Sequence, residues 1–270
     1  MRYLGNKTRL IPFLSRAIDR YVSEPGVACD PFSGTASVAS ALKQAGWRVH
    51  AGDLMAFSYA LQVVRVQLDH TPRFKADVLP PADRNGSRST SYGRLVEHLE
   101  TLPGEDGFLT EHYTLAGDDG KAHGRMYFTA ENARRIDAVR RRIDDWQSSG
   151  LVDQTRAQLL IATLLEAADR VANTTGVYAS FVKTFQPNAR RPLELRALRP
   201  TQPVNGASGC RAFLGPAVEL LQTVGPVDLL YLDPPYNGRQ YPGYYHIPEL
   251  LARGWTVPPP LRGKTGLIPD

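Results

Sequence analysis

A carboxylate, two prolines and an aromatic ring follow one another at Asp233, Pro234, Pro235 and Tyr236. They come directly after the apolar run 229–232, which is typical of a buried strand. Open α/β sheets bind their ligands at the carboxyl ends of such strands. Proline restricts its own φ and the residue before it, so this segment holds its hydrogen-bond acceptors without reorganisation. The four residues therefore predict a catalytic site with fixed acceptors and a ring that can stack on a ligand.

A second polar strand end lies near the N-terminus, where Asp30 follows the apolar residues 27–29 and precedes Phe32 and Gly34. A helix is expected over 36–44, and its N-terminus offers free N–H groups to a ligand. Glycine allows the backbone to approach that ligand closely. The loop departs from the G-x-G-x-x-G pattern, and its carboxylate would repel a pyrophosphate. It suits a positively charged cofactor such as S-adenosylmethionine, which carries an ammonium and a sulfonium.

Three more residues extend this candidate cofactor site. Asp53 ends the next expected strand, 48–52, at the spacing from Asp30 where an acid grips a ribose diol in dinucleotide-binding folds. The alternative is that Asp53 caps the helix that follows. Tyr3 and Lys7 precede the first expected helix, where Lys7 either offers a cation to a carboxylate or is simply solvated.

The composition bounds the class of protein. The 270 residues carry 32 Lys and Arg against 27 Asp and Glu, a net charge of +5. This mild excess is expected of a protein that binds a polyanion, but many soluble enzymes carry a similar charge. The two cysteines, Cys29 and Cys210, form no CxxC pair, so no structural zinc site is expected. Apolar runs of membrane-span length and the apolar core of a signal peptide are both missing, which predicts a reduced, cytoplasmic protein.

The chain divides into a sheet-forming part and an insertion between its halves. Residues 1–69 and 201–270 carry the strand-and-loop motifs and predict one discontinuous α/β domain. Residues 70–200 form the insertion. Its first part, 70–124, is rich in Pro, Gly, Ser and charge and predicts long loops. A long helix expected over 154–171 makes the insertion mostly helical.

Two stretches of the insertion carry positive charge. The first is a helix expected to begin near Thr129, whose arginines alternate with aspartates, so that a solvated, salt-bridged face is the favoured interpretation. Its arginines are Arg134, Arg135, Arg140, Arg141 and Arg142. The second is the irregular segment 173–192, where Lys183, Arg190 and Arg191 have no neighbouring acids. Such cations, mixed with aromatic and amide side chains, bind phosphates and bases, so this segment predicts DNA contact.

The order of these motifs resembles the Dam-like family of adenine-specific DNA methyltransferases. In that family an N-terminal motif, a cofactor loop, a target-recognition region and Asp-Pro-Pro-Tyr follow one another, and the resemblance covers nearly the whole chain. It implies an α/β, Rossmann-like sheet that binds S-adenosylmethionine, with 70–200 as the mostly helical target-recognition region. It further implies methylation of the adenine amino group in double-stranded DNA, in a restriction-modification system with a cognate restriction endonuclease.

The resemblance also implies a role for each motif. The residues implied to bind the cofactor are Tyr3, Lys7, Asp30, Phe32, Gly34 and Asp53. The base would meet Asp233 to Tyr236: Asp233 and the Pro234 carbonyl would accept hydrogen bonds from the adenine amino group, and Tyr236 would stack on a base extruded from the duplex. Accepting those protons localises the lone pair on nitrogen and aims it at the methyl carbon. Because the sulfonium is a strong leaving group, no metal is expected.

Two stretches depart from the family pattern. Residues 209–212 lack the acid that the family places near the adenine of the cofactor. Only residues 237–270 follow the catalytic motif, so the C-terminal strands of the full sheet are expected to be missing or supplied by a partner. Two alternatives to the DNA methyltransferase are a DNA-binding remnant without catalysis and an amino-methyltransferase acting on RNA or a protein amide.

Overall fold

The structure is a computed structural model, which describes residues 1–79, 90–203, 208–235, 241–255 and 259–268. The chain forms two compact units. The sheet unit comprises residues 3–71 and 198–239, and the helical unit comprises residues 1–2, 72–197 and 240–270. Each unit encloses apolar side chains of its own.

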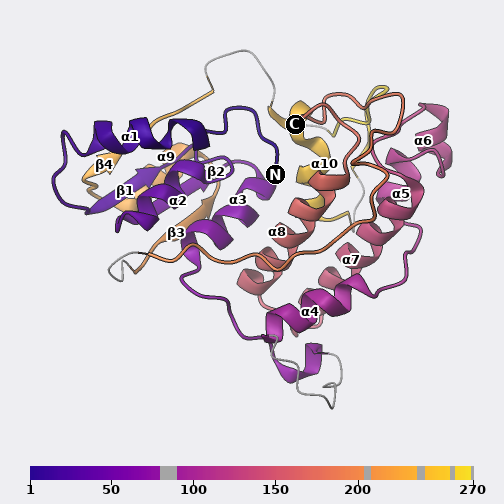
Figure 1. The fold of residues 1–270 in the computed structure, drawn as a ribbon, viewed down its shortest axis with the longest axis horizontal. Coiled ribbons are helices and arrows are strands. Elements are labelled where there is room, and N and C mark those ends of the chain that lie inside the picture. The colour runs from indigo at the N-terminus through magenta and orange to yellow at the C-terminus, as the bar shows by residue number, and fades with distance from the viewer. Residues whose placement is uncertain (80–89, 204–207, 236–240, 256–258, 269–270) are drawn as a thin grey trace. The chain divides into compact units, whose positions relative to one another are not determined.

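Four parallel strands in the order β3-β2-β1-β4 form the sheet (Figure 1). They are β1 (Val27–Asp30), β2 (Arg48–Asp53), β3 (Arg211–Leu214) and β4 (Leu229–Leu230). Cys29 of β1 lies opposite both His50 of β2 and Leu230 of β4. The chain moves outward from β1 through β2 to β3 and then returns to the other side of β1. This reversal is a topological switch point between β1 and β4, where open α/β sheets bind ligands. The predicted α/β class is confirmed.

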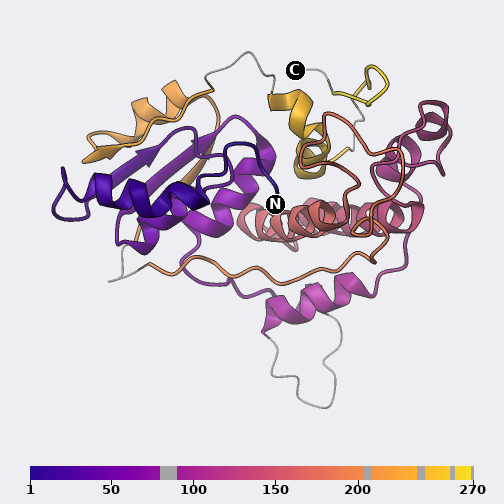
Figure 2. The ribbon, with the colours of Figure 1, turned by 45° about the horizontal axis from the view of Figure 1, so that its top comes forward.

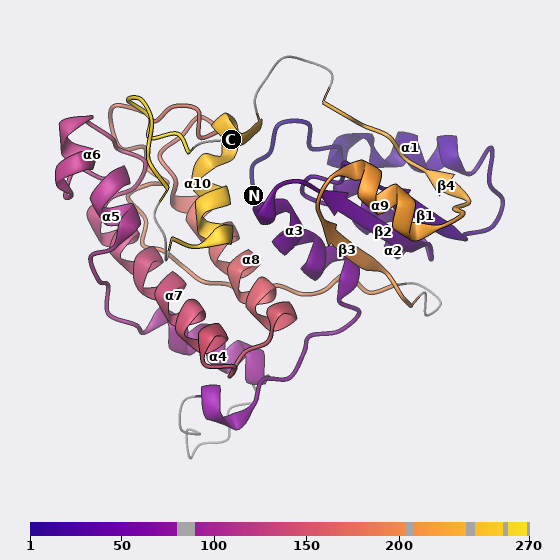
Figure 3. The same cartoon turned by 180° about the vertical axis from the view of Figure 1, so that it is seen from behind.

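Helices cover both faces of the sheet. They are α1 (Ile11–Ile18), α2 (Ser37–Gln44), α3 (Ala56–Gln62) and α9 (Ala217–Val224), with short turns η1 (Thr8–Leu10) and η2 (Val63–Gln67). Ala51 of β2 packs in the core with Leu42 of α2, whereas a Cβ on the adjacent Gly52 would meet Leu220 of α9 at 2.6 Å. Successive strand residues point to opposite faces. The sheet therefore lies between α2, in front in Figure 1, and α9, in front in the reverse view of Figure 3.

The helical unit is centred on two long helices, α7 (Ala130–Ser148) and α8 (Gln154–Val171), which run side by side in Figures 1 and 3 and overlap in the view of Figure 2. Its shorter helices are η3 (Ala76–Val78), α4 (Ser91–Glu100), α5 (Phe108–Tyr113), α6 (Asp118–Ala122) and α10 (Tyr241–Arg253). Side chains cap both long helices: Thr129 accepts from the Asn132 amide at 3.3 Å, and Asp153 accepts from the Arg156 amide at 2.9 Å. Such caps satisfy N–H groups that have no partner within the helix. The predicted helix at 154–171 is confirmed.

Two predictions about this unit were wrong. The segment expected to form long loops contains α4, whose Tyr92, Leu95 and Leu99 recur at helical spacing and are buried. Arg140 was expected on a solvated face, yet it is 2% exposed and donates to the Leu251 carbonyl at 2.7 Å. A buried carbonyl without a partner costs free energy, so α7 uses one of its arginines inside the unit.

The C-terminal residues pack differently from the predicted division. The prediction grouped 201–270 with the sheet, whereas residues 240–270 belong to the helical unit. The Tyr178 amide donates to the Tyr244 carbonyl of α10 at 2.8 Å, and the Tyr113 hydroxyl donates to the Gly266 carbonyl at 2.6 Å. These bonds fasten the C-terminal segment to the helices around α5 and α8.

Candidate active site

Three of the predicted acids come together at the carboxyl edge of the sheet. Asp30 ends β1, Asp53 ends β2, and Asp233 lies three residues beyond the end of β4. Parallel strands present their carboxyl ends at one edge, and this edge includes the switch point. Asp53 and Asp233 are both close enough to Asp30 to raise its pKa. The structure therefore gathers into one cluster the carboxylates that the sequence places far apart.

Asp30 is the most perturbed of these acids. It is 1% exposed, and burial raises its pKa to about 7, with further increases from Asp53 and Asp233. The Ser33 side chain and the Phe32 backbone act in the opposite direction. The Asp30 Oδ1 atom is buried without a hydrogen-bond partner among the residues that the structure describes. A buried acceptor in this condition is costly, and a cationic ligand would satisfy it.

Asp53 connects two loops at this edge. One carboxylate oxygen accepts from the Gly34 amide at 2.9 Å, and the other accepts from the Met55 amide at 2.9 Å. Met55, and not Asp53, is the N-cap residue of α3, so the second bond joins Asp53 to the start of the helix without making Asp53 its cap. Each carboxylate oxygen can accept more than one hydrogen bond, which leaves capacity for a ribose hydroxyl. Contact with the ribose stays a prediction.

The loop after β1 depends on glycine at position 34. Its φ is +52°, and a Cβ there would lie 2.8 Å from the ring of Tyr3. That separation is too short for any real side chain, so the Tyr3 ring can lie against the loop only because residue 34 is glycine. Tyr3 in turn lies 6.2 Å, centroid to centroid, from Phe57 of α3. Tyr3 and Gly34 are thus brought together, while the half-buried Phe32 completes the turn.

Lys7 makes an ion pair with Asp233: the Nζ atom lies 2.8 Å from Oδ2. The two side chains are 20% and 31% exposed, so the pair is partly shielded from solvent. Pro234 and Pro235 follow as exposed residues. Tyr236 lies outside the described residues, and its stacking on a base stays a prediction. The interpretation of Lys7 as a merely solvated residue is wrong.

The stretch 209–212 lies at the other end of its strand. Because β3 begins at Arg211, these residues are at its amino end, away from the carboxylate edge. Cys210 is buried there, and its sulfur accepts from the Val49 amide at 3.3 Å. None of the residues 209–212 is acidic, and Cys210 packs in the core of the sheet unit.

The predicted DNA-contact residues lie on a loop of the helical unit, residues 172–193, which we call the braced loop. Lys183, Arg190 and Arg191 are all exposed on it. The loop has no regular secondary structure, and three asparagine side chains bond its backbone instead. Asn132 donates to the Ala189 and Arg191 carbonyls, Asn173 to the Met126 and Val182 carbonyls, and Asn188 to the Arg170 and Ala172 carbonyls, at 2.8–3.2 Å. These bonds hold the backbone that carries the three exposed cations.

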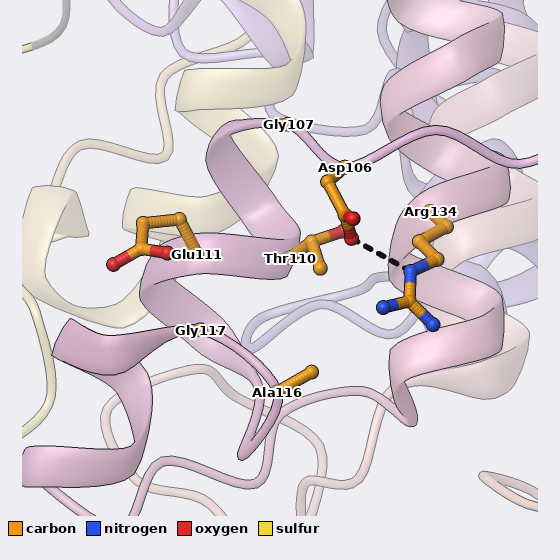
Figure 4. Close-up of a pocket in the computed structure, with 7 residues that line it drawn as sticks. All are labelled: Asp106, Gly107, Thr110, Glu111, Ala116, Gly117 and Arg134. Atoms are coloured by element: carbon orange, nitrogen blue, oxygen red, sulfur yellow. Dashed lines mark hydrogen bonds and ion pairs between the residues drawn. The ribbon is translucent and has the colours of Figure 1, made fainter.

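A polar pocket beside α5 in the helical unit carries no separate chemistry (Figure 4). Its lining consists of Asp106, Gly107, Thr110, Glu111, Ala116, Gly117 and Arg134. Asp106 accepts from Arg134 Nε at 2.7 Å across the pocket, and Glu111 accepts from the Asp119 amide at 3.1 Å. The polar groups of this pocket therefore serve the fold.

Within the described ranges, no group of three or more His, Cys, Asp or Glu side chains is arranged to hold a metal ion. In the same part of the chain, no helix is long and apolar enough to cross a membrane.

The comparison with known protein families indicates which reaction a carboxylate cluster of this kind serves. Residues 3–256 match the model of the D12 class N6 adenine-specific DNA methyltransferases. The chain belongs to this family. The match includes the carboxylate cluster, the loop after β1 and the braced loop, so every candidate residue of the site lies within it.

Individual relatives of this D12 methyltransferase are modification enzymes. The chain is 34% identical over 270 residues to the type II methyltransferase M.NlaIII of Neisseria lactamica, covering 99% of this chain and 73% of the relative. It is 32% identical to the modification methylase LlaI of Lactococcus lactis subsp. lactis and to the type II methyltransferase M.FokI of Planomicrobium okeanokoites. The chain spans only 40% and 39% of the length of these two relatives. No solved structure matches the chain.

Three residues around the site of this methyltransferase were not predicted from the sequence. Arg65 of η2 donates to the Thr35 carbonyl at 2.5 Å, and Gln62 of α3 donates to the Gly34 carbonyl at 3.4 Å. Tyr231 lies beside the cluster: burial raises its pKa, Asp233 raises the pKa further, and Lys7 lowers it. The first two act on the backbone across the unit, so no local pattern indicates them. The position of Tyr231 between the β4 strand and Asp233 is a signal that could have found it.

Proposed function

We propose that this chain transfers a methyl group from S-adenosylmethionine to the exocyclic amino group of adenine at a specific site in DNA. The observation that carries the proposal is the convergence of Asp30, Asp53 and Asp233 at the switch point of a D12-class sheet. The names of the relatives, type II methyltransferase and modification methylase, support a role in restriction-modification with a cognate endonuclease.

The edge fits a cofactor that carries positive charge. Asp30 offers a buried, unpartnered oxygen, which an ammonium group would satisfy. Tyr3 and Gly34 lie against each other in the loop beside it, where they and Phe32 would meet the cofactor, and Asp53 provides acceptors for the ribose hydroxyls. When bound, S-adenosylmethionine supplies an activated methyl carbon attached to a sulfur that leaves with the bonding electron pair.

Asp233 and the Pro234 carbonyl then act on the adenine amino group. By accepting its two protons in hydrogen bonds, they localise the nitrogen lone pair and direct it at the methyl carbon. The amino nitrogen would bond to the methyl carbon as the sulfur leaves, and it would give up one proton, which the Asp233 carboxylate would receive. Pro235 stiffens this segment, and Tyr236 provides the stacking platform for the extruded base.

Residues 70–200 act as the target-recognition region in this proposal. Lys183, Arg190 and Arg191 of the braced loop contact DNA phosphates or bases. Their exposure and the bracing of the loop backbone support this role, because a preordered loop loses less conformational entropy on binding.

Two features of the sheet unit complete the proposal. Leu230 and Leu232 are 43% and 55% exposed beside β4, at the edge of the described sheet. Parallel sheets are normally covered, so further strands, from this protein or a partner, are proposed to pair there. Cys29 and Cys210 are both free and buried, which fits a reduced, cytoplasmic enzyme that meets DNA.

The deciding experiment combines calorimetry with transfer of a tritiated methyl group. The wild type should bind S-adenosylmethionine and label unmethylated double-stranded DNA, but neither RNA nor protein. Asp233→Ala should bind the cofactor and lose the transfer, whereas the exposed control Asp145→Ala should keep both. Absence of cofactor binding by the folded wild type would favour a DNA-binding remnant. Full transfer by Asp233→Ala would refute the assigned role of Asp233.

A further inference from the structure

We propose that Lys7 is a positioning residue for the base-activating carboxylate: it holds Oδ2 of Asp233, so that the other oxygen is presented to the adenine amino group. This inference rests on the proposed function. It assigns Lys7 to the reacting base, whereas the family resemblance implied contact with the methionine end of the cofactor.

The geometry of the pair is the first argument. Lys7 Nζ lies 2.8 Å from Asp233 Oδ2, the distance of a charge-assisted hydrogen bond. A carboxylate on a short loop can rotate about its side-chain bonds, and a bond to one oxygen removes most of that freedom. The other oxygen, Oδ1, is then directed away from Lys7 and remains an acceptor for one amino proton.

Lys7 is itself held by the backbone around it. The Lys7 carbonyl accepts from the Leu10 amide at 2.7 Å and from the Ile11 amide at 3.1 Å, which fixes Lys7 at the start of η1. The Asn6 side chain accepts from the Thr8 amide at 2.8 Å in the same turn. A stiff turn limits where the Lys7 cation can lie, and the cation in turn limits where the Asp233 carboxylate can lie.

The charge distribution is the second argument. Asp30 lies close enough to both Asp53 and Asp233 for their charges to act on it, so the edge concentrates negative charge around Asp233. Lys7 offsets this charge, and its field reaches the neighbouring Tyr231 as well, where it acts against burial and Asp233, which both raise the pKa of Tyr231. The cation thus acts on the same small volume as the three acids.

The charges of the cofactor bear on the implied alternative. S-adenosylmethionine brings an ammonium and a sulfonium, which the carboxylates attract, and a methionine carboxylate, which a cation attracts. Lys7 is already paired with Asp233, and removing it takes away a repulsion of the ammonium and sulfonium as well as an attraction of the carboxylate, so we expect the affinity for the cofactor to change little. The loss should appear instead in the rate of the transfer step, which depends on the aim of Asp233.

The test separates affinity from rate. The variants are Lys7→Gln, Lys7→Arg and, as a matched control, Arg9→Gln, which changes an exposed cation two residues away. Calorimetry gives the dissociation constant for S-adenosylmethionine. Single-turnover transfer at saturating cofactor and DNA gives the rate, on a duplex carrying the site that the wild type labels.

For Lys7→Gln we expect a dissociation constant within about twofold of wild type and a rate at least about tenfold lower. Lys7→Arg should recover part of that rate, and Arg9→Gln should match the wild type. An affinity loss of about tenfold with a wild-type rate at saturation would instead assign Lys7 to the cofactor and overturn the proposal, as would an unchanged rate. A wild type that neither binds the cofactor nor labels DNA would refute the proposed function instead.

A double-mutant cycle guards against a merely structural effect. Asp233→Asn keeps an acceptor oxygen but removes the charge that Lys7 binds, so Lys7→Gln should cost less than about threefold in that background. If the two losses multiply in full, the residues act independently and the positioning role is refuted. The cycle also covers poor folding of Lys7→Gln, since a folding defect would persist in the double variant.

Discussion

Replacing Asp30 by asparagine is expected to make the cofactor-free protein more stable at neutral pH while abolishing cofactor binding. Asparagine has nearly the same shape and carries no charge. It therefore removes the cost of an ionised carboxylate that is 1% exposed and lies near Asp53 and Asp233. A binding site that carries such a cost trades stability for function.

The magnitude follows from the pKa of Asp30, which burial raises from 3.8 to about 7. In the window from about pH 4 to about pH 7 the native protein holds this proton and the unfolded chain does not, so the free energy of unfolding falls as the pH rises. A difference of about three pKa units corresponds to about 4 kcal/mol, of which about 3 kcal/mol is lost between about pH 5 and about pH 8.

Urea unfolding of the cofactor-free protein at these two pH values measures the effect. The stability difference between Asp30→Asn and the wild type should grow by about 3 kcal/mol from about pH 5 to about pH 8. Other titrating groups, such as Asp137 and His246, contribute to the pH dependence of both proteins, and their contributions cancel in this difference. Asp145→Asn, an exposed control, should follow the wild type. A difference between Asp30→Asn and wild type that is equal at both pH values would refute the reasoning.

Three further predictions test the loop, the helical core and the DNA surface. Gly34→Ala should lower cofactor affinity at least about tenfold and cost about 1–3 kcal/mol of stability. The control Gly225→Ala, also at positive φ but with nothing within 4 Å of the added Cβ, should leave the affinity unchanged. Equal affinities of the two variants would contradict the steric argument. Arg140→Ala should cost about 3–5 kcal/mol in urea unfolding, and the exposed Arg141→Ala less than about 1 kcal/mol; similar costs would show that burial of Arg140 is unimportant. Replacing the three cations of the braced loop by glutamine should reduce the salt dependence of DNA binding in fluorescence anisotropy, by about 0.9 in slope for each phosphate that the loop neutralises in the wild type. An unchanged slope would place the phosphate contacts elsewhere. The cations are Lys183, Arg190 and Arg191.

The sequence alone predicted the strands that carry the site. An apolar run followed by an acid is a local pattern, and it indicated that Asp30 and Asp53 end strands and that Asp233 follows one. Parallel strands present such ends at one edge, but which ends lie together depends on the strand order. Local capping chemistry likewise indicated the start of α7 near Thr129.

Other features depend on contacts between residues that are far apart in the sequence. The spacing of residues along the chain does not reveal such contacts. The Asp-Pro-Pro segment was recognisable by itself, but its electrostatic partner, Lys7, comes from the opposite end of the sheet unit's sequence. Arg140 looked like a surface residue until the Leu251 carbonyl was found against it. The asparagines that hold the backbone of the braced loop belong to no motif.

There is a physical reason why some features could be predicted from the sequence and others became visible only in the structure. Hydrophobic periodicity and turn chemistry act over a few residues, and they determine which groups stand at the ends of which elements. Strand order and side-chain packing determine which of those groups meet. Sequence therefore identified the carboxylates of this methyltransferase, and only the tertiary structure gave Asp30 its raised pKa and Asp233 its cation.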